Sequence, residues 1–252
     1  MQNYTIAETY TLPSKGRVYS SQVAPDVKIR SMTTMEEMRR LAPSELPYKN
    51  MCDIIDDCIV SELGISSYDM CLGDYLFLLH KLRSVTYGKV YKMTTTCPYC
   101  GTPTTVEVDL DSLEIKEYND EDLDRLSTFV LPQLKKKVTI HMQTPRTLDE
   151  IATEVKEYRK RNTGSSIDPT MIITMEKIID TVDGKKPDII NLREWVKNLP
   201  MADTNAILQH SDALNSCVGV ETNIEVDCPT CTLNFLTSFK ATNEFFRPAL
   251  DI

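Results

Sequence analysis

The chain has 252 residues, of which 41% are hydrophobic and 26% are charged, and its formal net charge is −9. This composition is typical of a globular protein that buries a core, and no apolar run approaches the roughly 18 residues of a membrane-spanning helix. The acidic charge argues against a protein whose whole surface binds nucleic acid, because phosphate backbones are bound by Lys and Arg. Other proteins are therefore the expected partners.

Residues 1–31 are predicted to form an extended arm. Short β-like segments in this region are interrupted at Pro13–Gly16 and again at Pro25. The arm has too few apolar residues for a core of its own, so we expect it to lie on the body or on a neighbouring protein. The first residues lack the basic start and apolar stretch of a signal peptide, which predicts a reducing compartment for the eight cysteines.

Residues 32–86 are predicted to be a helical region. A capping box of Thr34 and Glu37 is expected to open a first helix at about Met35–Leu41. Apolar residues at helical spacing predict a second, amphipathic helix over Tyr48–Leu63.

A third helix is predicted from Asp69 to Val85, and it is apolar enough on all sides to be the most buried. Its one histidine, His80, is expected to be a core residue, because no nucleophile with an orienting acid lies near it in the sequence. The three histidines are dispersed, and no phosphate loop or nucleophile elbow is present. These observations predict no catalytic residue.

The most specific feature is a set of four cysteines in two Cys-x-x-Cys pairs: Cys97 and Cys100, and Cys228 and Cys231. Each pair lies between two segments of β character. Two strand–turn–strand units can place four thiolates at the corners of a tetrahedron, which is the shell of a structural Zn²⁺. The spacing therefore predicts one zinc ribbon, split between residues 87–118 and 218–242, with these four cysteines as metal ligands.

Three other interpretations of the cysteines remain. Cys97-Pro-Tyr-Cys100 is also the active-site tetrapeptide of glutaredoxins, but that chemistry needs the pair to open a helix, and Pro103 and a β-rich run follow it here. A pair of disulfides is disfavoured in a reducing compartment. Two unrelated structural pairs are disfavoured because their flanking segments match. Zinc is the preferred interpretation.

Residues 119–217 are predicted to be a mainly helical insertion between the ribbon halves. Its expected elements are an acidic helix start or loop at Asp120–Arg125, a strand at Val138–Met142, a helix opened by a capping box of Thr147 and Glu150 and ending near Arg161, a flexible turn at 162–169, a helix from Pro169 to Val182, and short helices at Asn191–Asn198 and Asp203–Asn215. Residues 243–252 form a tail with two adjacent phenylalanines, expected to dock in cis or in trans. The predicted fold class is α+β, a mainly helical body with a split zinc-ribbon β element and extended N- and C-terminal arms.

Two segments near the N-terminus carry a family resemblance. Tyr10-Thr-Leu-Pro-Ser-Lys-Gly-Arg-Val-Tyr19 and Val27-Lys-Ile-Arg-Ser-Met-Thr-Thr-Met-Glu-Glu37 resemble the opening of a family of tailed-bacteriophage virion proteins, grouped with the T4-type baseplate hub assembly protein. Many members then have a Cys-Pro-x-Cys-Gly pair and a β-run like Val106-Glu-Val-Asp-Leu. The resemblance covers residues 10–115 and, more loosely, the second cysteine pair. It does not extend to the insertion.

The resemblance implies a non-enzymatic structural or assembly component of the hub region of a contractile tail baseplate. Such a protein would be assembled in the host cytoplasm, reside in the virion tail and bind other tail proteins in an oligomer or larger assembly. Two alternatives come from the residues themselves. A zinc-ribbon nucleic-acid-binding or transcription-associated factor is the first, although Thr, Val, Glu and Asp predominate around the cysteines. A thiol oxidoreductase is the second.

Overall fold

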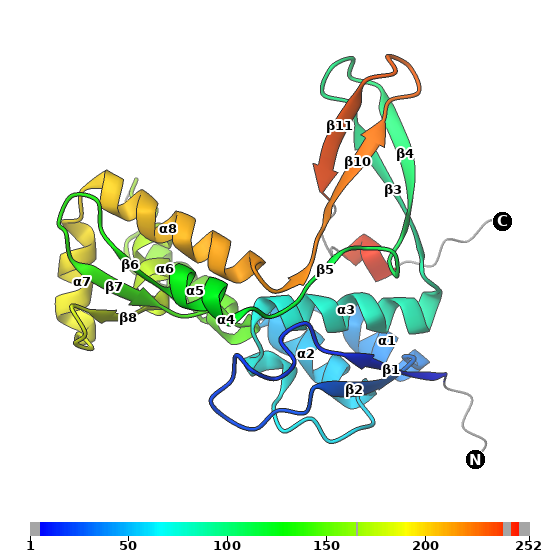
Figure 1. Ribbon diagram of the computed structural model, residues 1–252, viewed down its shortest axis with the longest axis horizontal. Helices are drawn as coiled ribbons and strands as arrows, with labels where there is room; N and C mark the ends of the chain where they lie inside the picture. The colour runs from blue at the N-terminus through cyan, green and yellow to red at the C-terminus, as the bar shows by residue number, and fades with distance from the viewer. Residues whose placement is uncertain (1–5, 165, 239–242, 247–252) are drawn as a thin grey trace.

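The computed structural model of the protein describes residues 6–164, 166–238 and 243–246. Predictions that concern residues 1–5, residue 165 of the predicted turn at 162–169, and residues 239–242 and 247–252 lie outside this part of the chain. Figure 1 shows three regions: a body that contains α3, a helical lobe to one side of it, and a pair of β-hairpins that stands away from both. The predicted α+β class is confirmed.

The body is built from an N-terminal hairpin and three helices: β1 (Ala7–Thr11), β2 (Asp26–Arg30), α1 (Thr34–Leu41), α2 (Pro47–Cys58), the 3₁₀ turn η1 (Ser67–Asp69) and α3 (Leu72–Tyr87). Strands β1 and β2 are antiparallel, with Tyr10 opposite Val27. Side chains alternate along β2, so that Val27 and Ile29 enter the same core as Leu12 and the apolar residues of α3. The N-terminal segment therefore lies on the body, which is one of the two placements expected from the sequence, and it contributes to the main core of the body.

The loop between β1 and β2 is held by a buried carboxylate of α3. Asp74 accepts hydrogen bonds from the backbone N–H of Ser14 (3.0 Å), from the Ser14 hydroxyl and from the Tyr19 hydroxyl (2.6 Å). Gly16 has φ +74°, and a Cβ there would lie 2.4 Å from the carbonyl oxygen of Val23. The Leu-Pro-Ser-Lys-Gly element is thus a structural turn anchored to the core.

The start of α1 differs from the prediction by one residue. Thr33 and Glu36 form the capping box: the Thr33 hydroxyl accepts from the N–H of Met35, and the Thr33 N–H donates to the Glu36 carboxylate at 2.7 Å. The predicted pair, Thr34 and Glu37, is therefore wrong. Glu36 is fixed on the inner side of the helix because Arg30 of β2 donates to it at 2.7 Å, and this contact sets the register of the cap.

Helix α2 ends at Cys58, before the predicted end at Leu63. Ile59 leaves the helix to form an antiparallel bridge with Ile29, and the N–H of Val60 donates to the carbonyl of Lys28 at 2.8 Å. Pairing with the free edge of β2 has replaced the last helical turn. The next helix is also shorter at its start than predicted, because residues 67–69 form η1 and α3 begins at Leu72.

The helical lobe consists of α4 (Asp120–Ser127), β6 (Thr128–Val130), β7 (Lys137–Ile140), α5 (Pro145–Arg161), α6 (Thr170–Ile178), β8 (Ile179–Val182), α7 (Ile189–Lys197) and α8 (Met201–Ser216). It has a separate core centred on Leu131, Val138, Ile178 and Ile207. The helix predicted from Pro169 to Val182 is wrong in its last turn. There the chain becomes β8, which pairs with β7 in the three-stranded sheet β6-β7-β8.

The lobe joins the body where α5 packs against α2 and η1. Asp149, 1% exposed, accepts from the backbone N–H groups of Tyr48 (3.3 Å) and Lys49 (2.8 Å), and so caps α2 from another element. Arg146 donates to both oxygens of Asp69, at 2.6 and 2.9 Å. The cap of α5 is Thr144 with Thr147, and Pro145 is the first helical residue, so the predicted Thr147–Glu150 box is replaced by an earlier one.

The ribbon consists of two antiparallel hairpins, β3 (Val90–Thr96) with β4 (Pro103–Asp109) and β10 (Asn223–Asp227) with β11 (Asn234–Ser238). They stand side by side in Figure 1, and the Thr95 and Thr237 hydroxyl oxygens are 3.0 Å apart. At their base the short strand β5 (Ile115–Lys116) pairs with β9 (Gly219–Val220). The β flanks predicted for both cysteine pairs are confirmed.

The described end of the tail docks in cis. It forms the 3₁₀ turn η2 (Asn243–Phe246), and Phe245 is fully buried, with its ring centroid 5.1 Å from those of both His80 and Tyr91. The Arg83 Nε–H donates to the carbonyl of Phe245 at 3.2 Å. His80 is 2% exposed and is therefore a core residue, as predicted. Over the described residues, no helix has both the length and the apolar character needed to cross a bilayer.

Candidate metal centre

The first cysteine pair lies in the turn between β3 and β4. The N–H of Cys97 donates to the carbonyl of Thr102 at 3.0 Å, and the N–H of Gly101 donates to the carbonyl of Cys97 at 2.9 Å. Gly101 has φ +73°, a conformation that glycine adopts without steric cost. The turn therefore folds back on itself and presents Cys97 and Cys100 on one side.

The second pair, between β10 and β11, has the same backbone hydrogen bonds. The N–H of Cys228 donates to the carbonyl of Leu233 at 3.1 Å, and the N–H of Thr232 donates to the carbonyl of Cys228 at 2.9 Å. The residue equivalent to Gly101 is Thr232, which has φ +59°. A β-branched residue is an outlier in this region of backbone space, so the second turn keeps this shape at a steric cost.

The two turns face each other at the tip of the ribbon and bring the four sulfur atoms together. All four Sγ atoms lie within 4.8 Å of one another. Two of these distances join the two turns: Cys97 to Cys231 at 3.7 Å, and Cys100 to Cys228 at 3.6 Å. A tetrahedral ZnS₄ shell with Zn–S bonds of about 2.3 Å has edges of about 3.8 Å. The donor set and its spacing fit a tetrahedral thiophilic metal ion.

The same distances exclude disulfides between these cysteines. A disulfide requires sulfur atoms about 2.05 Å apart, and all eight cysteines of the chain are free thiols. Three of the remaining four, Cys52, Cys58 and Cys71, are buried in the body, where desolvation raises the pKa of these thiols to about 12, 11 and 12. They are protonated core residues, in contrast to the four at the ribbon tip.

The thiols at the ribbon tip differ in pKa: those of Cys100 and Cys228 are lowered, whereas that of Cys231, against the lowering effect of the Leu233 N–H, is raised to about 12 by desolvation and by the neighbouring cysteines. The N–H of Cys231, helped by that of Thr230 and opposed by desolvation, lowers the pKa of the Cys228 thiol to about 6. The Thr102 hydroxyl, 3.2 Å from the Cys100 sulfur, lowers the pKa of that thiol with the help of the Thr102 backbone. Since the thiolate is the metal-binding form, the contacts at Cys100 and Cys228 favour the state that a metal ion needs, and Cys231 would lose its proton on metal binding.

The local fold does not provide the geometry of a glutaredoxin-type site. There a helix would have to begin at the cysteine pair, whereas here the chain continues from Cys100 through a turn into β4, which starts at Pro103. The sequence expectation that a strand follows the first pair is therefore confirmed.

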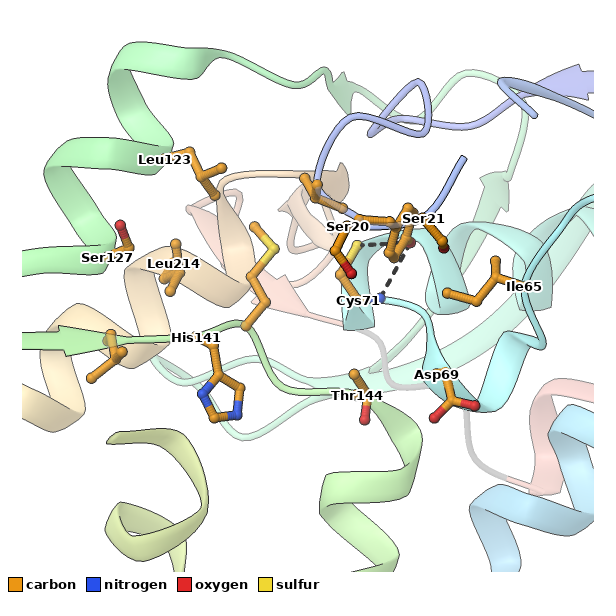
Figure 2. A pocket seen from close by; sticks show the side chains of 14 residues that line it. Ser20, Ser21, Ile65, Asp69, Cys71, Leu123, Ser127, His141, Thr144 and Leu214 are labelled. Carbon is orange, nitrogen blue, oxygen red and sulfur yellow. Dashed lines mark hydrogen bonds between the residues drawn. The ribbon is translucent and has the colours of Figure 1, made fainter. Parts of the chain in front are cut away.

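Apart from the cysteine cluster, a hollow lies where the body meets the helical lobe (Figure 2). It has a volume of about 480 Å³, with Cys71 on the body side and His141 on the lobe side. The Tyr19 hydroxyl contacts the Cys71 sulfur at 3.4 Å and accepts from the Cys71 N–H at 3.3 Å. Burial lowers the pKa of His141, so both ring and thiol are neutral at pH 7. This hollow offers space, but its thiol is not activated.

The fold and the cysteine cluster define an α+β protein whose β-ribbon is formed by two distant chain segments around four cysteines. The sequence model of the family described as T4 bacteriophage base plate protein matches residues 3–247. The chain belongs to this family, and it is a structural component of a phage tail baseplate. Comparisons with curated proteins and with solved structures gave no match. The family match includes the insertion, which the sequence resemblance alone did not reach.

Proposed function

We propose that this baseplate protein belongs to the hub region, where it acts without enzymatic activity as a structural or assembly component that binds other tail proteins. A structural Zn²⁺ held by Cys97, Cys100, Cys228 and Cys231 would stabilise it. The observation that carries the zinc proposal is the sulfur cluster, with separations of 3.6 and 3.7 Å across the two turns. The family match supports the baseplate role.

A bound metal ion would hold together two hairpins that are far apart in the sequence. Cys100 and Cys228 are 128 residues apart in sequence. Closing so long a loop costs only a few kcal/mol more than closing a short one, because the entropy grows with the logarithm of length. A structural zinc site contributes on the order of 10 kcal/mol. Zinc would therefore offset the closure and hold the hairpin of residues 87–118 against that of residues 218–242 at the tip of the ribbon, while β5 and β9 pair at its base, next to the insertion of residues 119–217.

The charge around the ribbon supports a protein partner in preference to a nucleic acid. Two lysines project from its first hairpin, and each faces an acid on the neighbouring strand: Lys89 lies 3.8 Å from Asp109, and Lys92 lies 3.2 Å from Glu107. Exposed pairs of this kind neutralise the basic groups locally. A zinc-ribbon factor that binds nucleic acid would instead need an excess of basic residues on this face.

Metal analysis of the protein purified under reducing conditions tests the zinc proposal. We expect one zinc per chain, retained on dialysis and lost in Cys228→Ser, whereas Cys52→Ser retains it. Absence of metal from the reduced wild-type protein would refute a zinc site. The baseplate role is tested separately by mass spectrometry of purified tails and of baseplate assembly intermediates, which should contain this chain. Its absence from both would refute the hub proposal and leave the zinc result standing.

A further inference from the structure

Helix α1 exposes apolar side chains and buries a charged one, which is the reverse of an ordinary surface helix. An amphipathic helix normally buries its apolar side and exposes its charges. In α1 the apolar residues Met35, Met38 and Leu41 are 65%, 61% and 67% exposed, whereas Glu36 is buried. Successive members of this trio are three residues apart, so their side chains are neighbours on the helix surface. They form one continuous apolar face, which we call the α1 face.

The charges of α1 are all used within the molecule. The four charged side chains of the helix are Glu36, Glu37, Arg39 and Arg40. Glu36 accepts from Arg30 at 2.7 Å, Arg40 donates to both oxygens of Glu37 at 2.8 and 2.7 Å, and Arg39 is paired with Asp57 of α2. The guanidinium of Arg40 also lies over the ring of Phe246, at 5.4 Å. These contacts fix the orientation of α1 and keep its apolar side outward.

The chemistry of the α1 face restricts what can cover it. Because each charge of the helix already has an intramolecular partner, the face offers neither a basic nor an acidic group to attract an oppositely charged segment. An apolar helix has matching geometry, since residues at this spacing form a ridge that packs into the groove of another helix. Methionine side chains are also flexible and polarizable, and they adapt well to a partner surface.

The size of the face argues against a stable dimer of this chain. Three side chains of this kind expose on the order of 100 Å² each, whereas a stable pair buries roughly 800 Å² per partner. A contact of this size holds a partner when other contacts already keep both proteins in place, as in a multi-protein assembly. The chain belongs to a family of baseplate proteins, which supplies that setting.

We propose that the α1 face, formed by Met35, Met38 and Leu41, docks an apolar helix face of another protein of the baseplate. This inference rests on the proposed function and assigns it one surface. The docking energy would come from apolar burial, so it would persist at high salt, unlike a contact made by ion pairs.

Incorporation of variants into purified tails and baseplate intermediates tests the proposal. Met38→Glu places a charge in the centre of the face, and we expect at least a tenfold loss of incorporation, quantified by mass spectrometry. Met38→Leu keeps the face apolar and should stay within twofold of the wild type. Ile190→Glu alters an isoleucine of α7 that is 73% exposed and serves as the matched control. All three purified variants should have the same melting temperature as the wild type, because none of these side chains is buried.

The outcomes distinguish this inference from the proposed function. If the wild-type chain is incorporated and Met38→Glu is incorporated equally well, the α1 face is refuted and the hub role stands. If the wild-type chain is found in neither tails nor intermediates, the hub role fails, and the inference fails with it. Where the wild-type chain is incorporated, a photo-crosslinking amino acid at position 38 identifies the segment that covers the α1 face. A crosslink to an apolar helix of another tail protein supports the proposal, and a crosslink to a second copy or to residues 247–252 of this chain overturns it.

Discussion

The body and the ribbon are stabilised in different ways. The body packs the apolar residues of β2, α2 and α3 into one core, which includes fully buried side chains such as Ile54, Leu78 and Phe245. Among the described residues, the separate apolar cluster at the ribbon tip has Cys97, Val226, Cys228 and Phe235 as its buried members, so half of them are proposed metal ligands, whereas Tyr91 and Val108 of the first hairpin belong to the body core. A pair of two-stranded hairpins with so little apolar burial is marginal in water. We therefore expect the body to fold by burial alone and the tip of the ribbon to depend on its four proposed metal ligands.

The largest expected effect is the selective loss of the ribbon when the metal is removed. Chelation, or Cys97→Ser, should bring amide exchange in β10, in β11 and in the ends of β3 and β4 next to the cysteines close to unfolded rates, because the proposed zinc would contribute on the order of 10 kcal/mol. Amides of α3 should remain protected. Hydrogen exchange read by mass spectrometry measures both regions in one sample.

Cys52→Ser is the control for this experiment. Cys52 is fully buried in the body, and its replacement should cost about 1–2 kcal/mol of global stability while leaving the exchange of the ribbon unchanged. Equal, small effects of Cys52→Ser and Cys97→Ser would contradict the shared metal site and the difference between the two regions.

Phe245→Ala should have the second largest effect and should act on the body. Its ring fills the space between α3 and β3, and truncation of a buried phenylalanine costs about 3–5 kcal/mol. We expect a lower midpoint in chemical denaturation with an unchanged zinc content. The matched variant is Phe235→Ala, in the ribbon core, which should weaken zinc retention and leave the unfolding of the body unaltered. If the two variants had the same effects, the regions would not be independent.

Acid should destabilise the body through His80. Burial, with a smaller contribution from Lys81, lowers the pKa of His80 from 6.5 to about 4. A lowered histidine pKa means that the unfolded state takes up a proton first, so the contribution to stability is complete above pH 6.5 and decreases as the pH falls towards 4. His80→Leu should reduce the slope of stability against pH in this window. Denaturation in a Cys228→Ser background removes the contribution of zinc release, and an unchanged slope would refute the role of His80.

Local signals in the sequence predicted much of this architecture. The Cys-x-x-Cys spacing with β-rich flanks indicated two matching turns, since few other arrangements use that pattern. Apolar periodicity located the helices of the body and of the insertion to within a turn or so. The double phenylalanine of the tail indicated a docking segment, although its cis placement depends on Arg83, which is distant in the chain.

The missed features are set by contacts between distant residues. Thr33, not Thr34, caps α1 because Arg30 fixes Glu36 on the inner side. Residues 179–182 were predicted to be helical because they continue an apolar face, but the edge of β7 offered them strand partners. Asp149 had no sequence signal as the cap of α2, since the two helices are adjacent only in the folded chain. Propensity decides only where such competing partners are absent.

The smallest expected effect compares the two cysteine turns with each other. They share their backbone hydrogen bonds, but the left-handed position holds Gly101 in one and Thr232 in the other. A left-handed conformation costs a non-glycine residue about 1–2 kcal/mol. Replacement by glycine removes this cost, but glycine loses more backbone entropy on folding, which offsets part of the benefit. Thr232→Gly should therefore strengthen zinc retention by less than about 1 kcal/mol, whereas Gly101→Thr should weaken it by about 1–2 kcal/mol. Competition with a chromogenic chelator measures both changes.

Thr232→Ser is the control. The Thr232 hydroxyl donates to the carbonyl of Cys231 at 2.7 Å, and serine keeps both that hydrogen bond and the left-handed strain, so this variant separates the contribution of the hydroxyl from that of the backbone conformation. If Thr232→Gly weakened retention while Thr232→Ser did not, the hydroxyl rather than the backbone conformation would distinguish the two turns.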